Sequence, residues 1–301
     1  MSCSELYRTG ELLNRVRRAY DRLRRCDLCP HDCGVNRIVG ERGLCRAGFR
    51  PRIASANLHT GEEPPVSGSL GSGTVFFTGC SLACRFCQNF PISQLDNGEE
   101  LTPVALAERL LRLQGRKAHN INFVTPTHYL PQILAALWLA VAKGFTLPLV
   151  WNSSGYEKVD ALELLDGVVD IYLPDMKYHD EATARAFSSA PGYRDANRAA
   201  VSEMLRQVGH LEVDDNGVGV RGLIVRHLVL PDGADGSSEI LPWIAQNLGR
   251  ETHVSLMKQY FPAHRATVMP ELSRRITDEE YALAVEALDA AGLENGWVQE
   301  S

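Results

Sequence analysis

The sequence predicts an α/β protein: a partial (βα)6 barrel preceded by an N-terminal helix and a four-cysteine metal-binding arm. Six short apolar runs alternate with helical segments between residues 74 and 291. Strands that are continuous apolar runs are typical of a parallel sheet covered by helices. All eight cysteines lie at or before Cys87, and seven of them form two tight groups. In a chain of 301 residues, six such units favour a partial barrel over a closed eight-stranded one.

The N-terminal part is expected to contain a helix and then the arm. Residues 5–25 carry a rough apolar stripe at helical spacing, which predicts a helix. A stretch rich in glycine, proline and serine follows the arm at 61–73 and is interpreted as a connector. The chain is therefore divided into an N-terminal unit, 1–60, and a barrel unit, 61–301.

The elements of the barrel unit alternate regularly. Thr102 is a helix N-cap with Pro103 in the first turn, and Thr277 forms a capping-box pattern with Glu280. The predicted strands are 74–78, 120–125, 147–152, 168–173, 223–230 and 252–256. The predicted helices are 103–114, 131–143, 159–165, 197–208, 239–248 and 277–291. Ligands of such folds bind at the carboxyl ends of the strands, so the residues just after each strand are the candidates.

The loop after the first strand carries Cys80, Cys84 and Cys87 in Cys-x3-Cys-x2-Cys spacing. Three thiolates suit soft iron sites. Since a cuboidal cluster has four irons, three cysteines leave one iron without a protein ligand. An open coordination position is what a reacting cofactor needs. A zinc knuckle or buried free thiols are the alternatives.

This spacing, with Phe86 just before the third cysteine, resembles the signature of the radical S-adenosylmethionine (SAM) superfamily. The resemblance implies a [4Fe–4S] cluster whose open iron binds the amino and carboxylate groups of SAM. It also implies that an electron splits SAM into methionine and a 5′-deoxyadenosyl radical, which abstracts hydrogen from a substrate. Phe86 would lie against the adenine, and Asn89 is assigned to the same cofactor site. A reductant such as flavodoxin or ferredoxin is the expected partner.

The second and third strand ends offer hydroxyl and amide groups. Thr125 and Thr127 stand where many radical SAM proteins carry a Gly-Gly-Glu element that binds the amino group of SAM. Their hydroxyls are candidate acceptors, although Pro126 between them also predicts a tight turn. Asn152 and Ser154 suit ribose or carboxylate contacts, and an Asn/Ser turn is the alternative.

The fourth and fifth strand ends resemble those of pyruvate formate-lyase activating enzymes. Asp175 and Lys177 are two residues apart, so an extended chain points both in the same direction. In those enzymes the Asp-x-Lys element contacts SAM. By the same resemblance, Arg226 would anchor a carboxylate and His227 would contact SAM or steer a proton. A surface ion pair and a hydrogen-bonded core histidine are the alternatives.

The wider resemblance covers nearly the whole chain. It is carried by the runs at 33–37, 120–128, 170–175, 226–231 and 294–299. These runs are similar to those of bacterial and archaeal radical SAM proteins grouped with the activating enzymes.

A second group places four cysteines within twenty residues, before the barrel begins. Its members are Cys26, Cys29, Cys33 and Cys45. Four soft ligands close a tetrahedral site, which is typical of structural zinc. An auxiliary iron–sulfur cluster is equally compatible with four cysteines. His31 is a possible replacement for one ligand, and the compact grouping indicates a reducing cytosol rather than disulfides.

Composition and charge argue against several classes of partner. The formal net charge is −6, which gives no support to a nucleic-acid partner. The arginines of the first 25 residues are interpreted as a solvated helix face. The longest apolar run, 133–142, is far short of the roughly 20 residues that span a bilayer. A cytoplasmic protein without a membrane partner is expected.

Three functions remain open at this point. The first is an activase-like enzyme that abstracts hydrogen from a glycine of a glycyl-radical enzyme. The second is a radical SAM enzyme acting on a small molecule, such as a sugar epimerase. The third is a non-catalytic iron–sulfur electron carrier. No motif in the sequence assigns a residue as a catalytic hydrogen donor or as a catalytic base.

Overall fold

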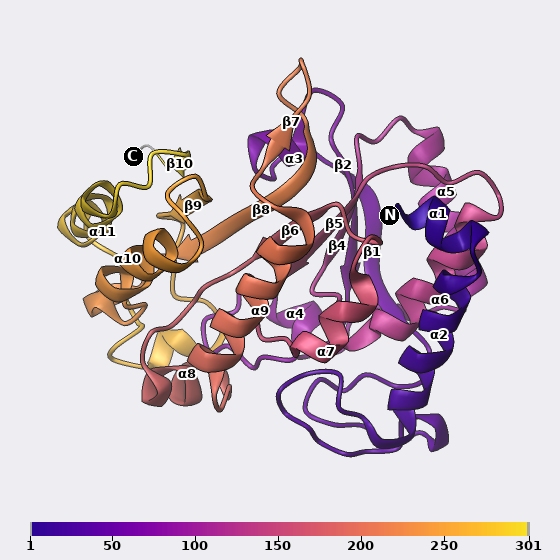
Figure 1. The fold of residues 1–301 in the computed structure, drawn as a ribbon. Coiled ribbons are helices and arrows are strands. Elements are labelled where there is room, and N and C mark those ends of the chain that lie inside the picture. Colours follow the sequence, from indigo (N-terminus) through magenta and orange to yellow (C-terminus); the bar gives the residue numbers. More distant parts are fainter. Residues whose placement is uncertain (1, 300–301) are drawn as a thin grey trace.

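A computed structural model describes residues 2–299, and its helices and strands are arranged around one sheet (Figure 1). The strands are β1 (Arg52–His59), β2 (Ser72–Phe77), β3 (Glu99–Glu100), β4 (Ile121–Val124), β5 (Leu149–Ser153), β6 (Ile171–Pro174), β7 (Glu212–Val213), β8 (Gly219–Leu228), β9 (His253–Met257) and β10 (Gly296–Val298). The helices are α1 (Cys3–Arg8), α2 (Glu11–Asp21), α3 (Pro64–Ser67), α4 (Phe90–Ser93), α5 (Pro103–Gly115), α6 (Leu130–Val141), α7 (Val159–Leu162), α8 (Glu181–Ser188), α9 (Tyr193–Val208), α10 (Ser237–Asn247) and α11 (Asp278–Ala291).

The strand order is β10-β9-β8-β6-β5-β4-β2-β1-β3, with β7 paired to β8. Every pairing from β2 through to β10 along this path is parallel. All six predicted strands are present, as β2, β4, β5, β6, β8 and β9. The sheet ends in free edges at β3 and β10 and does not close. The predicted partial barrel is confirmed.

Four strands were not predicted. Two of them are antiparallel neighbours of the barrel strands at one edge: β1 pairs with β2, and β3 pairs with β1. Of the other two, β7 pairs antiparallel with β8, and β10 extends the parallel sheet beyond β9. Because β1 falls within residues 1–60, the N-terminal unit contributes a strand to the sheet of the barrel unit.

The helix predicted over 5–25 is wrong in its continuity. The segment forms α1 and α2, and Gly10 between them has a φ of +80°, which an α-helix does not allow. A 3-10 turn at Arg22–Arg25 then leads into the arm. Other predicted helix starts hold, since Thr102 caps α5 and Thr277 forms its capping box with Glu280 at α11.

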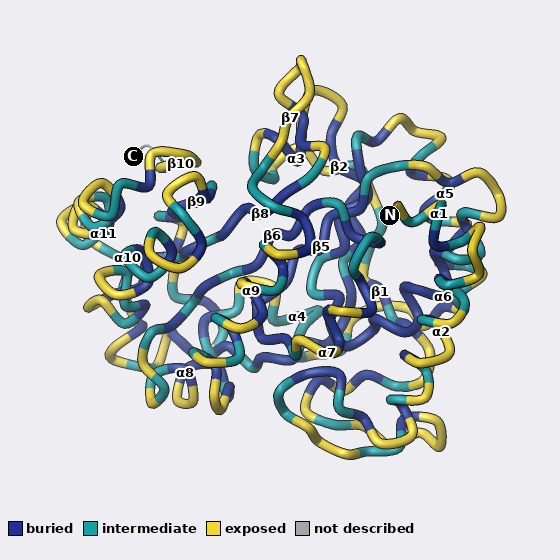
Figure 2. The backbone as a smooth tube through the Cα atoms, viewed as in Figure 1, coloured by how far each residue is buried: buried dark blue, intermediate teal, exposed yellow. Residues whose placement is uncertain are grey.

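Most of the helices cover one face of the sheet, and the strands beneath them are buried (Figure 2). Side chains such as Phe123 and Trp151 alternate toward this outer face and join the main core. Their neighbours in the strands point to the inner face. There, Val150 and Ile224 pack against Val66 of α3. The segment expected to be a connector therefore covers part of the inner face.

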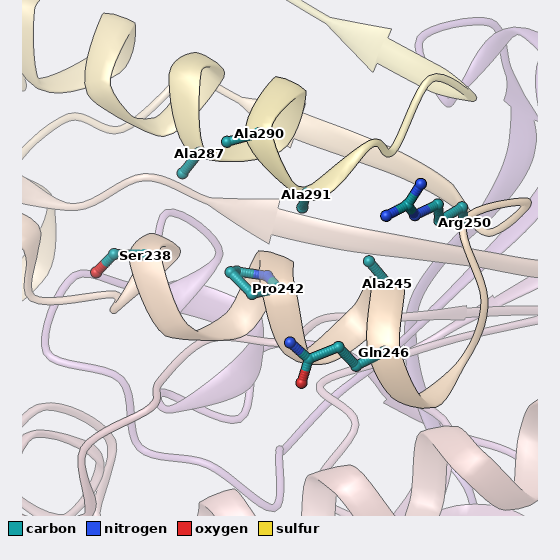
Figure 3. A pocket seen from close by; sticks show the side chains of 8 residues that line it. All are labelled: Ser238, Pro242, Ala245, Gln246, Arg250, Ala287, Ala290 and Ala291. Carbon is teal, nitrogen blue, oxygen red and sulfur yellow. The ribbon is translucent and has the colours of Figure 1, made fainter.

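A groove of about 480 Å³ lies between α10 and α11 (Figure 3). It is lined by Ser238, Pro242, Ala245, Gln246, Arg250, Ala287, Ala290 and Ala291. None of these residues is a candidate site residue from the sequence. Within residues 2–299, no helix has the length and apolar character needed to cross a membrane.

Candidate active site at the carboxyl edge of the sheet

The cysteine loop begins where β2 ends, at the carboxyl edge of the parallel sheet. Gly79 has a φ of +78° and starts the turn. The backbone N–H of Ala83 donates to the carbonyl of Ser188 at 2.9 Å, and that of Arg85 donates to Phe187 at 2.7 Å. These bonds attach the loop to the end of α8, about one hundred residues further along the chain.

Each sulfur of the loop has a polar neighbour. The Ser188 hydroxyl donates to Cys84 Sγ at 3.0 Å, and the Leu82 N–H donates to Cys80 Sγ at 3.3 Å. Cys87 Sγ lies 3.2 Å from the Ser93 hydroxyl. Hydrogen bonds to sulfur are one of the features that set the reduction potential of an iron–sulfur cluster. This donor set of three thiols in a protected loop fits such a cluster.

Burial raises the pKa of the Cys84 thiol to about 11, although the nearby Lys177 ammonium opposes the shift. A soft metal that binds this thiol must therefore displace its proton. Phe86 is buried beside the thiols and packs against Tyr260, with 5.7 Å between ring centroids. Asn89, by contrast, is exposed at the start of α4.

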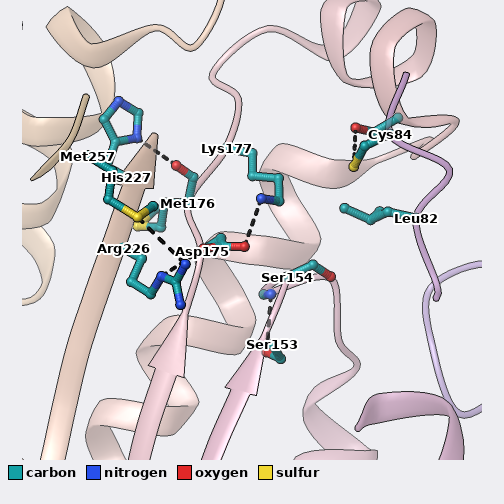
Figure 4. Close-up of polar contacts among 12 residues, drawn as sticks. Leu82, Cys84, Ser153, Ser154, Asp175, Met176, Lys177, Arg226, His227 and Met257 are labelled. Atoms are coloured by element: carbon teal, nitrogen blue, oxygen red, sulfur yellow. Dashed lines mark hydrogen bonds and ion pairs between the residues drawn. The ribbon is translucent and has the colours of Figure 1, made fainter. Parts of the chain in front are cut away.

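The predicted Asp-x-Lys element lies next to this loop, at the end of β6 (Figure 4). Lys177 Nζ pairs with Asp175 Oδ2 at 2.7 Å. Arg226 Nε lies 3.5 Å from Asp175 Oδ1, across a bridge that joins the end of β6 to β8. Burial lowers the pKa of Lys177, but Asp175 and Cys84 outweigh it and the net pKa is raised. The ammonium therefore stays charged. The side chains of Lys177 and Asp175 are only 15% and 17% exposed, so the pair is largely buried and is not an exposed surface pair.

His227 is fully buried and both of its ring nitrogens are engaged within the protein. Its Nδ1 contacts the Met176 carbonyl at 2.6 Å. Its Nε2 lies 3.1 Å from Asp235 Oδ1 and 2.9 Å from the Ser237 hydroxyl. His227 is therefore a hydrogen-bonded core histidine in this structure. Neither of its ring nitrogens is directed at Arg226 or Asp175.

The two predicted threonines have different surroundings. Thr127 is buried, and its hydroxyl donates to Glu157 Oε1 at 2.8 Å. Thr125 is half-buried with a φ of +56°, and its N–H donates to the Asn152 carbonyl at 2.8 Å. Positive φ is uncommon for threonine and indicates that the turn is held by its surroundings.

Glu157 was not predicted, and it organises the ends of β4 and β5. Oε1 also accepts from Trp151 Nε1, and Oε2 accepts from the Ser153 hydroxyl, both at 2.8 Å. Burial raises the pKa of Glu157, and the three donors oppose that shift. Alternation along β5 then places Asn152 on the inner face, opposite to Ser153.

Glu62 and Glu63 are also additions to the site that sequence reasoning missed. Asn152 Nδ2 donates to Glu62 Oε2 at 3.4 Å. Arg226 Nε lies 3.5 Å from Glu63 Oε1. The available signal was two consecutive carboxylates within a stretch, 61–73, that is otherwise rich in glycine, proline and serine and has no other charged residue.

The four-cysteine arm packs against the loop that carries Cys80. One cavity is lined by all four thiols together with His31, Arg37 and His128; the four are Cys26, Cys29, Cys33 and Cys45. His31 Nε2 contacts the Ser81 carbonyl at 2.7 Å. Within residues 2–299, no three His, Cys, Asp or Glu side chains are placed to hold a single metal ion.

The family model described as the Radical SAM superfamily matches residues 74–229. The chain belongs to the radical SAM superfamily. Members of this superfamily cleave SAM with an iron–sulfur cluster and draw on a reductant. The predicted superfamily is confirmed.

Relatives extend the match beyond the barrel. The uncharacterized protein MJ0674 of Methanocaldococcus jannaschii is 34% identical over 89% of this chain and 75% of its own length. The pyruvate formate-lyase-activating enzyme of Clostridium pasteurianum is 24% identical over 68% of this chain and 82% of its own length. A radical SAM methyltransferase from Sphaerobacter thermophilus aligns with a TM-score of 0.48 and 19% identity, over 75% of this chain and 65% of that one.

We expect Gly79→Ala to destabilise this radical SAM protein by about 3 kcal/mol or more. Gly79 has a positive φ, and a Cβ there would overlap the carbonyl oxygen of Cys45. Gly10→Ala is the matched control, because Gly10 has a similar φ of +80° and no atom within 4 Å of the added Cβ. The control should cost only about 1 kcal/mol. Urea denaturation of both variants measures the difference, and equal losses would contradict the contact between arm and loop.

Proposed function

We propose that Cys80, Cys84 and Cys87 hold a [4Fe–4S] cluster and that SAM lies against the inner face beside it. When bound, the cluster supplies the electron that splits SAM into methionine and a 5′-deoxyadenosyl radical. The observation that carries the proposal is the largely buried Asp175–Lys177 pair beside the cysteine loop, whose ammonium opposes the rise that burial causes in the pKa of the Cys84 thiol.

The chain's own side chains would orient SAM from three sides. Lys177 and Arg226 are the cations suited to its carboxylate, and Asp175 suits an ammonium or a hydroxyl. Asn152 and Ser154 offer amide and hydroxyl groups for the ribose. Phe86 offers an apolar wall for the adenine. Thr127 and His227 would act indirectly, since the protein already engages their polar atoms.

The decisive test uses protein reconstituted without oxygen with iron and sulfide. With dithionite and SAM, we expect formation of 5′-deoxyadenosine and methionine, measured by chromatography. A reducible cluster that forms no 5′-deoxyadenosine would instead indicate an electron carrier.

For the substrate, we propose a glycine of a glycyl-radical enzyme, from which hydrogen is abstracted. The support is the Asp175–Lys177 element together with similarity to the activating enzyme of Clostridium pasteurianum. Reduced protein, SAM and a candidate glycyl-radical enzyme should give the doublet of a glycyl radical in an EPR spectrum. Its absence with every cognate candidate, while 5′-deoxyadenosine still forms, would contradict this substrate. A flavodoxin or ferredoxin is the proposed electron donor.

A small-molecule substrate is the second candidate. The observation that favours it is the pair Glu62 and Glu63, which lies within the sheet's curve beside Arg226. The side chains of Glu62 and Glu63 are each only 9% exposed. A small ligand can reach carboxylates at this depth, whereas the surface of a folded protein cannot. Transfer of deuterium from a labelled candidate substrate to 5′-deoxyadenosine, measured by mass spectrometry, would identify such a molecule.

The four-cysteine arm is proposed to hold a second metal centre. Its four cysteines line one cavity. Four thiolates can hold either an iron–sulfur cluster or a structural zinc ion. The proposal is an auxiliary iron–sulfur cluster, with zinc as the alternative.

Metal analysis should find about eight irons per chain after reconstitution, and little zinc. Cys29→Ser is expected to lower the iron content to about four while the cluster of the radical SAM motif persists. Elemental analysis and EPR of the reduced protein measure both. One zinc and four irons per chain in the unmodified protein would establish the zinc alternative instead.

A further inference from the structure

The segment 62–67, which contains α3 and lies on the inner face of the sheet, is held there by packing and hydrogen bonds. Val66 of α3 packs against Val150 and Ile171, near the starts of β5 and β6. Asn120 Nδ2 donates to the Val66 carbonyl at 2.7 Å. The Ser67 hydroxyl donates to the Glu62 carbonyl at 3.2 Å. The backbone that presents Glu62 and Glu63 is therefore held in place rather than free in solution.

Carboxylates outnumber cations around Arg226. Glu62 Oε2 lies 3.9 Å from Arg226 Nη1, and Glu63 Oε1 lies 3.5 Å from Nε. Asp175 approaches the same Nε at 3.5 Å and holds Lys177 on its other oxygen. Three carboxylates thus share two cations, which leaves one formal negative charge in a largely buried space. A buried charge without a partner is costly.

Several buried polar atoms here have no hydrogen-bond partner. The acceptors among them are Glu63 Oε2, Asp175 Oδ1, Ser154 Oγ and Asn122 Oδ1, and the donors are Asn122 Nδ2 and Arg226 Nε. The Asn122 side chain is on a fully buried residue of β4. Asn122 pairs with Val150, two residues before Asn152, so it faces the same inner side as Asn152 and Glu62. Buried polar groups in native proteins are normally satisfied, so these atoms point to a ligand.

We propose that Glu62, Glu63, Asn122 and Ser154 form a binding site for a protonated amine. An ammonium has three donors and no acceptor, which matches unpartnered carboxylate, amide and hydroxyl oxygens. It also balances the excess negative charge, whereas an anionic group would increase the imbalance. Burial raises the pKa of Glu62, with Arg226 opposing the shift, and an adjacent cation would lower it. The inference rests on the proposed radical SAM function of the same site.

Two molecules could supply the amine: SAM, through its amino group, or the substrate. The test therefore has two arms on reconstituted protein, with Glu62→Gln, Glu63→Gln and the double variant. Equilibrium dialysis measures the affinity for SAM. Ligand-observed NMR, with SAM present, measures the binding of n-pentylamine and of its uncharged analogue n-pentanol. Glu286→Gln, an exposed position on α11, is the control for the change in charge.

The double variant is expected to lose at least about tenfold in affinity in one arm. Loss in the SAM arm assigns the site to the amino group of SAM. Loss in the n-pentylamine arm alone, with n-pentanol not binding, assigns it to the substrate. The proposal is overturned if SAM affinity is unchanged and n-pentylamine either does not bind the unmodified protein or binds the double variant equally well.

The proposed function has a separate readout in the same samples. If the unmodified protein forms no 5′-deoxyadenosine with dithionite and SAM, the radical SAM assignment of this site fails. If the unmodified protein forms 5′-deoxyadenosine and the double variant has the same affinity as it for SAM and for n-pentylamine, only the proposed amine site is contradicted. Thermal denaturation of each variant confirms that the substitutions leave the fold intact.

Discussion

Replacing Cys87 by alanine is expected to abolish formation of 5′-deoxyadenosine from SAM. Cys87 lies half-buried in the loop after β2, with its sulfur 3.2 Å from the Ser93 hydroxyl. Removing one of three thiolates leaves two, which do not retain a cuboidal cluster. Anaerobic reconstitution should therefore yield about four fewer irons per chain than the unmodified protein binds. Chromatography of the reaction with dithionite and elemental analysis of the protein check the two expectations.

Cys3→Ala provides the matched control for this experiment. Cys3 is a free, partly buried cysteine on α1, outside both cysteine groups. Its removal changes the thiol count by the same amount and should leave both iron content and SAM cleavage as they were. Retention of SAM cleavage by Cys87→Ala would show that the cluster is bound elsewhere, with the four-cysteine arm as the first candidate.

Local pattern was sufficient to predict the parallel part of the sheet. The runs that form β5, β6 and β8 carry apolar residues on both faces, because helices cover one face and the α3 segment packs against Val150, Ile171 and Ile224 on the other. The edge strand β10 was missed because it has three residues and is formed by its pairing with β9. The hairpin partner β1 was missed because its burial is irregular, so its sequence lacks a clear two-residue alternation.

The site residues divide in the same way, into those that a local sequence pattern predicts and those that only the fold brings together. The three cysteines were found because their function depends on spacing within eight residues. Glu62 was missed because its partners, Asn152 and Arg226, lie 90 residues or more away in the chain. Only the fold brings them together. For His227 the motif gave the position in the strand, but only the fold shows that Asp235 and Ser237 engage its Nε2.

Glu157→Ala is expected to be the most destabilising single substitution near the site, at about 3–5 kcal/mol. Glu157 is 2% exposed, and its carboxylate accepts hydrogen bonds from Thr127, Trp151 and Ser153, each at 2.8 Å. Alanine would leave three buried donors without an acceptor and would create a cavity beside Trp151. Urea denaturation of the apoprotein measures the loss without interference from the cluster.

Glu157→Gln separates the hydrogen bonds from the charge. Its amide oxygen can still accept from Thr127 and Trp151, and its NH2 can donate to the Ser153 hydroxyl. We therefore expect a cost of about 1 kcal/mol, well below that of alanine. Because these bonds hold the end of β5 where Asn152 and Ser154 face the inner side, alanine should also weaken SAM binding, and glutamine should largely preserve it. Equal losses in the two variants would mean that the negative charge, and not the three-donor network, holds these strand ends in place.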